Sequence, residues 1–373
     1  MPPNVVDPET IDPKNPEQLA EYLENLDLKQ VVREKGSYQV YPEVYYPPLQ
    51  PYEHKDAGHL ADPKLASIYD NAEKIQDLTP HIGTEVHGIQ LSNLTEQQKN
   101  DLALLVARRG VVFFKDQDIR VKKSLDLGRH YGKHKYHNVG GHPPHVNEVL
   151  ILHIEHEKPQ IRERLSYRSP GDGWHSDVSY ELQPGGLAFL KIDTLPGEAG
   201  GDTLWGTSGY EAYDRLSPAW KTFLEGLEAI HSGDVHRETA RATGQPLRRE
   251  APDNAHPVIR THPVTGWKSL FVNRGFTRKI VGFTRRESDA VLNFLFDHIE
   301  SGIDFQVRFK WTEDTVAVWD NRVTYHNPVY DYFGGKGLRH GYRVSPSAER
   351  PYFDPKSKSR REALAEEAEK NKA

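Results

Sequence analysis

The feature that most constrains the fold is a series of short apolar segments separated by glycine, proline and charged residues. Val111–Phe114, Leu187–Asp193 and Thr315–Trp319 are compact apolar segments, and apolar and polar residues alternate across 305–311. Runs of about four to eight such residues indicate strands, and strict alternation indicates a half-buried strand. Because helices and strands do not alternate regularly, we expect a mainly β fold with added helices. A double-stranded β-helix (jelly-roll, cupin-like) core fits best, since it closes its sheet edges.

Local signals place several helices between these strands. Capping boxes that start at Thr95 and at Thr284 predict two amphipathic helices, and Gly110 should end the first. A shorter helix after Ser217 is expected to bury Phe223. Residues 232–254 are polar and show no period, so we expect a surface loop or lid there.

Composition divides the chain into three parts. Residues 1–78 are rich in proline, tyrosine and acidic residues and predict an extended N-terminal arm with a short helix at Pro16–Leu26. Residues 79–350 hold all the strand and helix signals and are expected to form one domain. Residues 351–373 are charged and lack an apolar face, which predicts a solvated tail.

Charge and residue usage exclude several classes of function. The net charge of -6 argues against a nucleic-acid partner, because phosphate binding requires clustered lysine and arginine. No apolar run approaches the roughly 20 residues that a membrane span needs, so no membrane partner is expected. The chain has no cysteine and no basic, then apolar, leader, which together favour a cytoplasmic protein. Without thiolates, any metal must be held by histidine and carboxylate ligands.

The stretch Trp174-His175-Ser176-Asp177 supplies a His-x-Asp pair. With one more histidine, such a pair forms the facial triad of non-haem Fe(II) enzymes, which leaves coordination positions open for co-substrate and O₂. His326, which follows the segment Trp319-Asp320-Asn321-Arg322, is the candidate third ligand. Taken alone, the pair also fits an ordinary hydrogen-bonded loop, and His326 fits a strand-end histidine.

Several motifs in order resemble the TauD/TfdA family of Fe(II)- and 2-oxoglutarate-dependent dioxygenases, in its fungal-type taurine or sulfonate form. The first is Trp174–Tyr180, the second is Gly200–Trp205 and the third is Trp319–His326. A final Arg-x-x-x-Arg follows as Arg339 and Arg343. One such motif could arise by chance, whereas four in family order indicate a common origin.

The resemblance implies an oxidoreductase in which His175, Asp177 and His326 hold Fe(II). It assigns Thr203 and Arg339 to the distal carboxylate of 2-oxoglutarate, for which the forked donors of arginine are well suited. With O₂, the co-substrate would be converted to succinate and CO₂ while the substrate is hydroxylated. A catalytically silent binding module and a zinc hydrolase are the alternatives from other classes, and neither needs Thr203 or Arg339.

The expected substrate is a small anionic molecule. Arg343 should face the same side of its strand as Arg339, and the resemblance gives it, with His137, the substrate's anionic head. His134 is a rival, because the segment His134-Lys135-Tyr136-His137-Asn138 departs from the family pattern His-x-His-Pro. A sulfonate such as taurine is the first expectation, with release of sulfite and an aldehyde. An amino acid, another carboxylate or a purine is the alternative, and a homodimer or homotetramer is the expected assembly.

Overall fold

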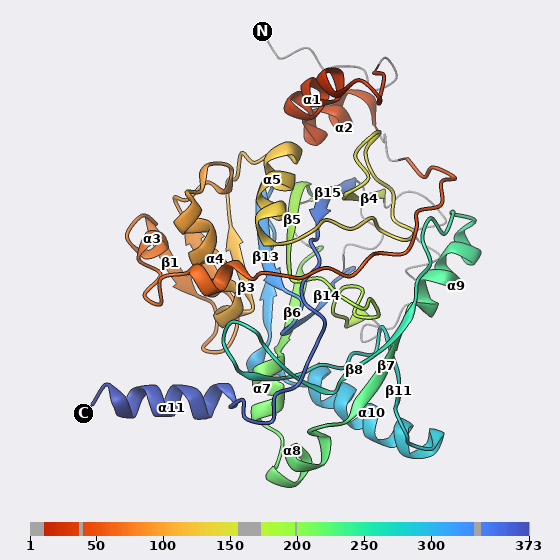
Figure 1. The fold of residues 1–373 in the computed structure, drawn as a ribbon. Helices are drawn as coiled ribbons and strands as arrows, with labels where there is room; N and C mark the ends of the chain where they lie inside the picture. Colours follow the sequence, from red (N-terminus) through yellow and green to blue (C-terminus); the bar gives the residue numbers. More distant parts are fainter. Residues whose placement is uncertain (1–10, 37–39, 156–172, 198–199, 332–336, 373) are drawn as a thin grey trace.

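A computed structural model describes residues 11–36, 40–155, 173–197, 200–331 and 337–372 of the chain. Its largest element is a seven-stranded sheet with the order β1-β2-β3-β13-β5-β15-β4 (Figure 1). All neighbouring strands pair antiparallel except β2 and β3, which are parallel. The strands are β1 (Lys74–Asp77), β2 (Thr84–His87), β3 (Val111–Phe114), β4 (Val149–Glu155), β5 (Leu187–Thr194), β13 (Thr315–Asp320) and β15 (Leu338–Val344).

Three smaller sheets accompany the large one. The sheet that matters most for function has the order β12-β6-β14, and the others have the orders β11-β7-β8 and β10-β9. Their strands are β6 (Thr203–Ser208), β7 (Glu228–Ser232), β8 (Asp253–Pro257), β9 (Ile259–Thr261), β10 (Lys268–Leu270), β11 (Thr277–Ile280), β12 (Val307–Phe309) and β14 (Thr324–Pro328). The expectation of a mainly β protein with added helices is therefore confirmed.

The core explains why the apolar runs are continuous. Strand β3 is buried along its whole length, because its side chains alternate between two apolar layers. Phe113 faces the β12-β6-β14 sheet, where it stacks on Phe309 with ring centroids 3.7 Å apart and meets Trp205 edge-on. Val112 and Phe114 face the opposite side and pack in one cluster with residues of helix α4 (Glu96–Arg109).

The helices predicted from capping boxes begin where the sequence predicts. In α4, the Thr95 hydroxyl accepts from the amide of Gln98, while the Gln98 side chain accepts from the Thr95 amide. Gly110 follows with a φ of 75°, a value that favours glycine. Between residues 121 and 300, the other α-helices in the described part of the chain are α5 (Val121–Tyr131), α7 (Gly209–Asp214), α8 (Pro218–Leu224), α9 (Asp234–Thr243) and α10 (Arg285–Glu300).

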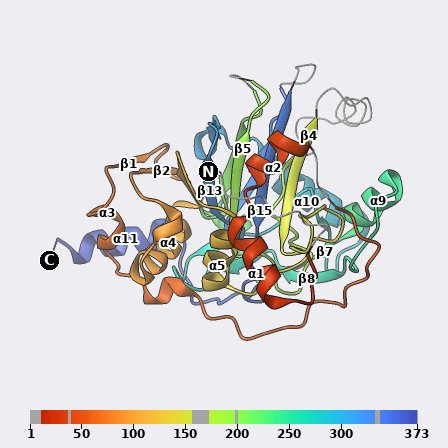
Figure 2. The same ribbon diagram turned by 90° about the horizontal axis from the view of Figure 1, so that it is seen from above.

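The N-terminal arm contains more helix than expected. The predicted helix is present as α1 (Pro16–Asn25), and α2 (Leu28–Lys35) and α3 (Ala66–Tyr69) add to it. The first two pack against α5 and the β15-β4 side of the large sheet (Figure 2). Residues 1–10 and 37–39 of the expected arm lie outside the described residues, and β1 already belongs to the sheet.

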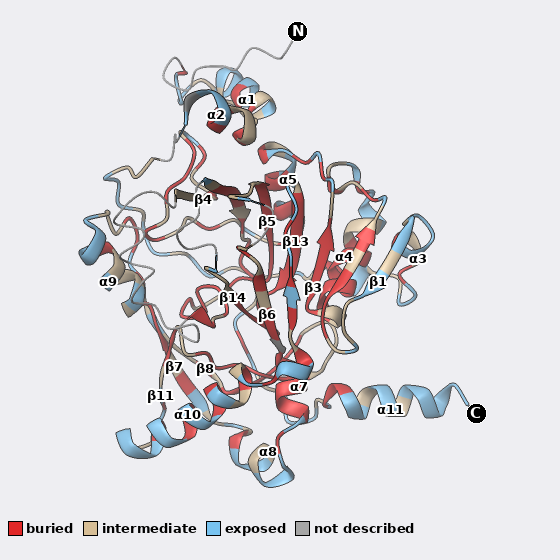
Figure 3. Cartoon of the chain, turned by 180° about the vertical axis from the view of Figure 1, so that it is seen from behind, coloured by how far each residue is buried: buried red, intermediate tan, exposed pale blue. Residues whose placement is uncertain are grey.

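The expected tail forms the charged helix α11 (Arg360–Lys370), which projects from the body of the protein with a largely exposed surface (Figure 3). Two local expectations were wrong. Phe223 is 44% exposed and packs edge-on against Trp220. Residues 232–254 contain helix α9, and Arg248 and Arg249 within this range are fully buried. Among the described residues, no helix is long and apolar enough to cross a membrane.

Candidate active site

His175, Asp177 and His326 lie together at strand β14, which carries His326. A two-residue β-bridge joins the histidines: the His175 amide donates to the His326 carbonyl over 3.1 Å, and the His326 amide donates back over 2.9 Å. Asp177 Oδ1 lies 3.5 Å from His175 Nε2 and 3.9 Å from His326 Nε2. His326 is 149 residues after Asp177, and it meets the His-x-Asp pair because strand β14, which carries it, returns beside that pair.

The arrangement fits a divalent metal. One ligand atom from each of the three residues lies within 4.8 Å of the other two. His175 Nδ1 lies 2.7 Å from the Gly173 carbonyl oxygen, so it carries the proton and leaves the Nε2 lone pair for a metal. Asp177 Oδ2 is buried and has no hydrogen-bond partner in the described part of the chain, which an unligated carboxylate would rarely tolerate.

Asn321 fixes the carboxylate ligand from behind. Its Oδ1 accepts from the backbone amide of Asp177 over 3.2 Å and from Trp319 Nε1 over 2.9 Å. Its Nδ2 donates to the Gly186 carbonyl over 3.1 Å, and its own carbonyl accepts from the Ser176 hydroxyl. The turn between β13 and β14 therefore holds the loop that carries Asp177.

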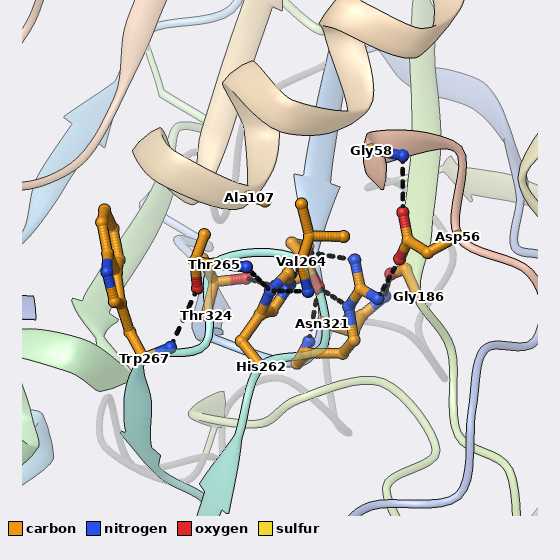
Figure 4. A network of polar contacts seen from close by, with 12 residues as sticks. Asp56, Gly58, Ala107, Gly186, His262, Val264, Thr265, Trp267, Asn321 and Thr324 are labelled. Carbon is orange, nitrogen blue, oxygen red and sulfur yellow. Dashed lines mark hydrogen bonds and ion pairs between the residues drawn. The ribbon is translucent and has the colours of Figure 1, made fainter. Parts of the chain in front are cut away.

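Arg322, the next residue, holds that turn in place. Its guanidinium donates to both oxygens of Asp320 over 2.8 and 2.7 Å and to Asp56 of the arm. His262 Nε2 lies 2.9 Å from Asp320 Oδ2, and Figure 4 shows Asp56 and His262 pointing toward this cluster. Burial alone would lower the pKa of Arg322, but the surrounding carboxylates raise it above its ordinary value.

A second histidine-carboxylate group, His54, Asp56 and Glu349, also has its ligand atoms close together. Arg322 Nη1 already lies 3.3 Å from Glu349 and bonds to Asp56. The Arg322 guanidinium therefore already supplies the positive charge beside these carboxylates, and the group is not a candidate metal site.

Arg343 connects the large sheet with the candidate metal ligands. From β15 it donates through Nη1 to Asp177 Oδ1 over 2.7 Å, while its Nε is buried without a hydrogen-bond partner among the described residues. Burial by itself would raise the pKa of Asp177, but Arg343 and the two histidines lower it well below its ordinary value. Burial and the neighbouring His175 lower the pKa of His326 to about 3. Asp177 is thus an ionised carboxylate and His326 a neutral imidazole.

The two residues expected to bind 2-oxoglutarate, Arg339 and Thr203, both lie near Gly201. Arg339 is buried on β15, four residues before Arg343, and its Nη2 lies 3.5 Å from the Gly201 carbonyl. Thr203 follows Gly201 at the start of β6, and its hydroxyl accepts from Trp311 Nε1 over 3.0 Å. Arg339 Nε is buried without a partner in the described chain, so a donor is free for a ligand.

The two candidate histidines are placed differently. His137 shares a cavity with Asp177 and Arg343, and its Nδ1 accepts from the amides of Val139 and Gly140 over 3.2 and 2.6 Å. His134 does not line that cavity, and its Nε2 lies 2.8 Å from the Leu125 carbonyl. The geometry therefore favours His137 over His134.

Sequence patterns missed several residues of the cavity. Lys135, Asn138 and Arg249 line it, and Arg249 Nη2 bonds to Glu181 over 2.6 Å and to Asn138 over 3.1 Å. Arg249 falls in the stretch that we expected to be a surface loop. The only signal for these lining residues in the sequence was that the segment 134–138 departs from the family pattern.

Comparison with protein families matches residues 74–345 to the family described as "Taurine catabolism dioxygenase TauD, TfdA family". The chain is 38% identical over 346 residues to the alpha-ketoglutarate-dependent sulfonate dioxygenase of Saccharomyces cerevisiae, which covers 89% of this chain and 82% of the yeast protein. It is 42% identical over 338 residues to the alpha-ketoglutarate-dependent dioxygenase cnsP of Penicillium expansum, which covers 86% of this chain and 90% of that protein. The crystal structure of a taurine dioxygenase from Burkholderia xenovorans superposes with a TM-score of 0.62 at 31% identity, over 76% of this chain and 92% of that one.

Proposed function

The chain belongs to the TauD/TfdA family of Fe(II)- and 2-oxoglutarate-dependent dioxygenases, and from this premise we propose that it hydroxylates a small organosulfonate. The unstable hydroxylated product would release sulfite and an aldehyde. One observation carries the choice of an anionic substrate: Arg343 and His137 line a single cavity together with Asp177. A cationic donor so close to the metal ligands brings the carbon next to an anionic head group within reach of the oxidising centre.

We assign His175, Asp177 and His326 as the iron ligands. Iron bound there, with 2-oxoglutarate and O₂, supplies the oxidative decarboxylation to succinate and CO₂ and the oxidising power for C–H hydroxylation. The protein's part is to orient these groups. His175 is held in its ligating tautomer by the Gly173 carbonyl, and Asn321 fixes the loop of Asp177.

Arg339 and Thr203 are our candidates for the distal carboxylate of 2-oxoglutarate. The buried guanidinium of Arg339 lies beside Gly201 with a donor to spare, and Thr203 adds a hydroxyl at the start of β6. A buried carboxylate requires charge compensation, which a permanently charged, forked donor provides.

For the substrate head, Arg343 offers charge and His137 offers a directed donor. Burial, together with His236 and Arg343, lowers the pKa of His137 well below its ordinary value, so the ring is neutral. Because its Nδ1 accepts two backbone hydrogen bonds, the ring proton sits on Nε2. His137 can therefore donate to an anion without depending on pH in the neutral range.

A substrate screen tests the proposal. The purified protein is incubated with Fe(II), 2-oxoglutarate and a panel of sulfonates, sulfate esters, carboxylates and amino acids, with succinate and sulfite both measured. We expect succinate and sulfite in equal amounts from at least one sulfonate. Succinate formation with carboxylates or amino acids alone, and no sulfite from any sulfonate, would refute the sulfonate assignment and leave the dioxygenase chemistry intact.

The same chemistry on an amino acid, another carboxylate or a purine is the second candidate. It is favoured by the similarity to the Penicillium expansum dioxygenase, whose name specifies no sulfonate. Arginine binds carboxylates and sulfonates comparably well, so the screen must decide between them.

We also propose that the large sheet and the β12-β6-β14 sheet form the two halves of a double-stranded β-helix, with the metal ligands between them. The division into an arm (1–78), a catalytic domain (79–350) and a tail (351–373) is likewise a proposal, which limited proteolysis would test. The dimeric or tetrameric assembly and the cytoplasmic location suggested by the sequence can be tested by light scattering and by cell fractionation.

A further inference from the structure

Lys135 is a buried cation for which the described chain provides no hydrogen-bond partner. Lys135 lines the cavity shared by Asp177, His137 and Arg343, and its Nζ is buried and makes no hydrogen bond to any described residue. Leaving an ammonium group unpaired inside a protein is costly, so such groups are seldom retained without a use.

The carboxylates near Lys135 already have other partners. Glu181 Oε1 accepts from Arg249 over 2.6 Å, and Asp177 Oδ1 accepts from Arg343 over 2.7 Å. Neither carboxylate forms a hydrogen bond with Lys135, although both favour its charged form at longer range. Glu148, a further carboxylate of the cavity lining, is only half-buried.

Space is kept for the ammonium group. A Cβ atom at Gly185 would lie 3.1 Å from Lys135 Nζ and 3.1 Å from Asn321 Nδ2. Gly185 does not have a positive φ, so its backbone conformation does not require glycine. The missing side chain instead leaves room for Lys135 beside the turn that holds Asp177.

We propose that Lys135 is a further substrate-binding residue that forms, with Arg343 and His137, a three-donor site for a tetrahedral oxyanion head group. This inference rests on the proposed function and narrows its substrate class. A sulfonate or sulfate ester has three free oxygens for the three donors, whereas a carboxylate has two. Lys135 would thus be the residue that selects the tetrahedral head.

The electrostatic setting is consistent with this role. Burial is the main cause that lowers the pKa of Lys135, Glu181 and Asp177 oppose it, and Arg343 and Arg249 add to it, with a net pKa of about 8. At neutral pH most of the side chain is still charged. An anionic ligand would supply the hydrogen-bonded partner that the described chain does not provide.

Lys135→Met tests the inference, because methionine has a similar length and no charge. Binding of methanesulfonate and acetate to the Fe(II)–2-oxoglutarate enzyme is measured anaerobically by titration calorimetry, so the readout does not require turnover. We expect methanesulfonate to bind about tenfold more weakly than to the original protein, and acetate to change by less than about threefold. Affinities for Fe(II) and 2-oxoglutarate should stay the same.

The melting temperature separates a binding role from a structural one. Removing an unpaired buried charge should leave the Tm of Lys135→Met unchanged or higher. Lys123→Met, which changes an exposed lysine on α5, is the matched control and should alter neither binding nor Tm. Lys135→Gln, which keeps a polar side chain but removes the charge, is a second variant for the same measurements.

Unchanged methanesulfonate binding in both Lys135 variants would overturn the inference, and so would a lowered Tm in both, since that would show a structural partner. The test is independent of the reaction itself. If the original protein releases no sulfite from any sulfonate, but loses methanesulfonate affinity on Lys135→Met, the proposed function fails and the anion site stands. If the original protein binds methanesulfonate no better than acetate, the three-donor site is refuted whatever the substrate.

Discussion

Replacing Asn321 with leucine should weaken metal binding without touching a metal ligand. The side chain is 1% exposed and makes three hydrogen bonds, to the Asp177 amide, to Trp319 Nε1 and to the Gly186 carbonyl. Leucine has a similar volume but can replace none of them. The Asn321 carbonyl, which accepts from the Ser176 hydroxyl, is retained, so the loop stays attached at one point.

The size of the loss in stability follows from the hydrogen bonds that are removed and the buried polar groups that are left without a partner. Each lost hydrogen bond contributes about 0.5 to 1.5 kcal/mol, and each buried group left unsatisfied adds to this cost. For three bonds, we expect the free energy of unfolding to fall by about 2 to 4 kcal/mol. Residues that orient a metal ligand typically change metal affinity by about 10- to 100-fold, and we expect the Fe(II) dissociation constant to rise within that range.

Two measurements check this prediction. Thermal denaturation of the metal-free protein gives the stability, and anaerobic titration with Fe(II) gives the dissociation constant. Asn93→Leu, at an exposed position, is the control and should change neither beyond a small amount. A variant that loses stability but binds Fe(II) as tightly as the original protein would refute the view that Asn321 positions Asp177.

Further predictions concern the metal ligand, the two arginines of β15 and the buried ion-pair cluster. Asp177→Ala should abolish both metal binding and turnover, and retained activity would disprove the triad. Arg343→Ala should raise the KM for the substrate far more than the KM for 2-oxoglutarate, whereas Arg339→Ala should do the reverse; an inverted pattern in steady-state kinetics would mean that the two roles are exchanged. Burial would raise the pKa of Asp320, but Arg322 and His262 lower it below its ordinary value. The ionised Asp320 therefore stabilises the folded protein above the unfolded pKa of about 4, and this stabilisation is lost as the pH falls below that value. Arg322→Met should therefore flatten the dependence of Tm on pH below about 5, and an unchanged acid profile would contradict this account.

Local sequence signals predicted the elements that depend on neighbouring residues. The capping boxes at Thr95 and Thr284 mark helices α4 and α10, because a cap is built from residues only three apart. The run at β3 was recognised as a strand buried on both faces for a similar reason, since four successive apolar side chains leave neither face for solvent. The triad was reachable only because the family motifs linked His175 to a residue far away in the chain.

The features that the sequence did not reveal depend on contacts with residues far away in the chain. Arg249 looked like part of a surface loop, but its charge is compensated by Glu181, 68 residues earlier. Helix α9 lacks an apolar stripe, and its Asp234 instead pairs with Arg278 on β11. Phe223 occupies a buried-face position by periodicity, yet α8 is short and leaves it exposed. Periodicity measures the apolar face of an isolated helix and carries no information about which face the tertiary structure covers.

In our proposal, Arg343 links the candidate metal site to the candidate substrate site through one guanidinium. Asp177 Oδ1 accepts from Arg343 Nη1 over 2.7 Å, while Arg343 Nε has no hydrogen-bond partner among the described residues. A divalent metal at Asp177 takes over the neutralisation of that carboxylate, which weakens its attraction for Arg343 and raises the positive charge of the cavity. Both changes favour an anionic ligand on Arg343. The substrate head should therefore bind more tightly to the metal-loaded protein than to the metal-free one, and by linkage the anion should tighten metal binding by the same factor.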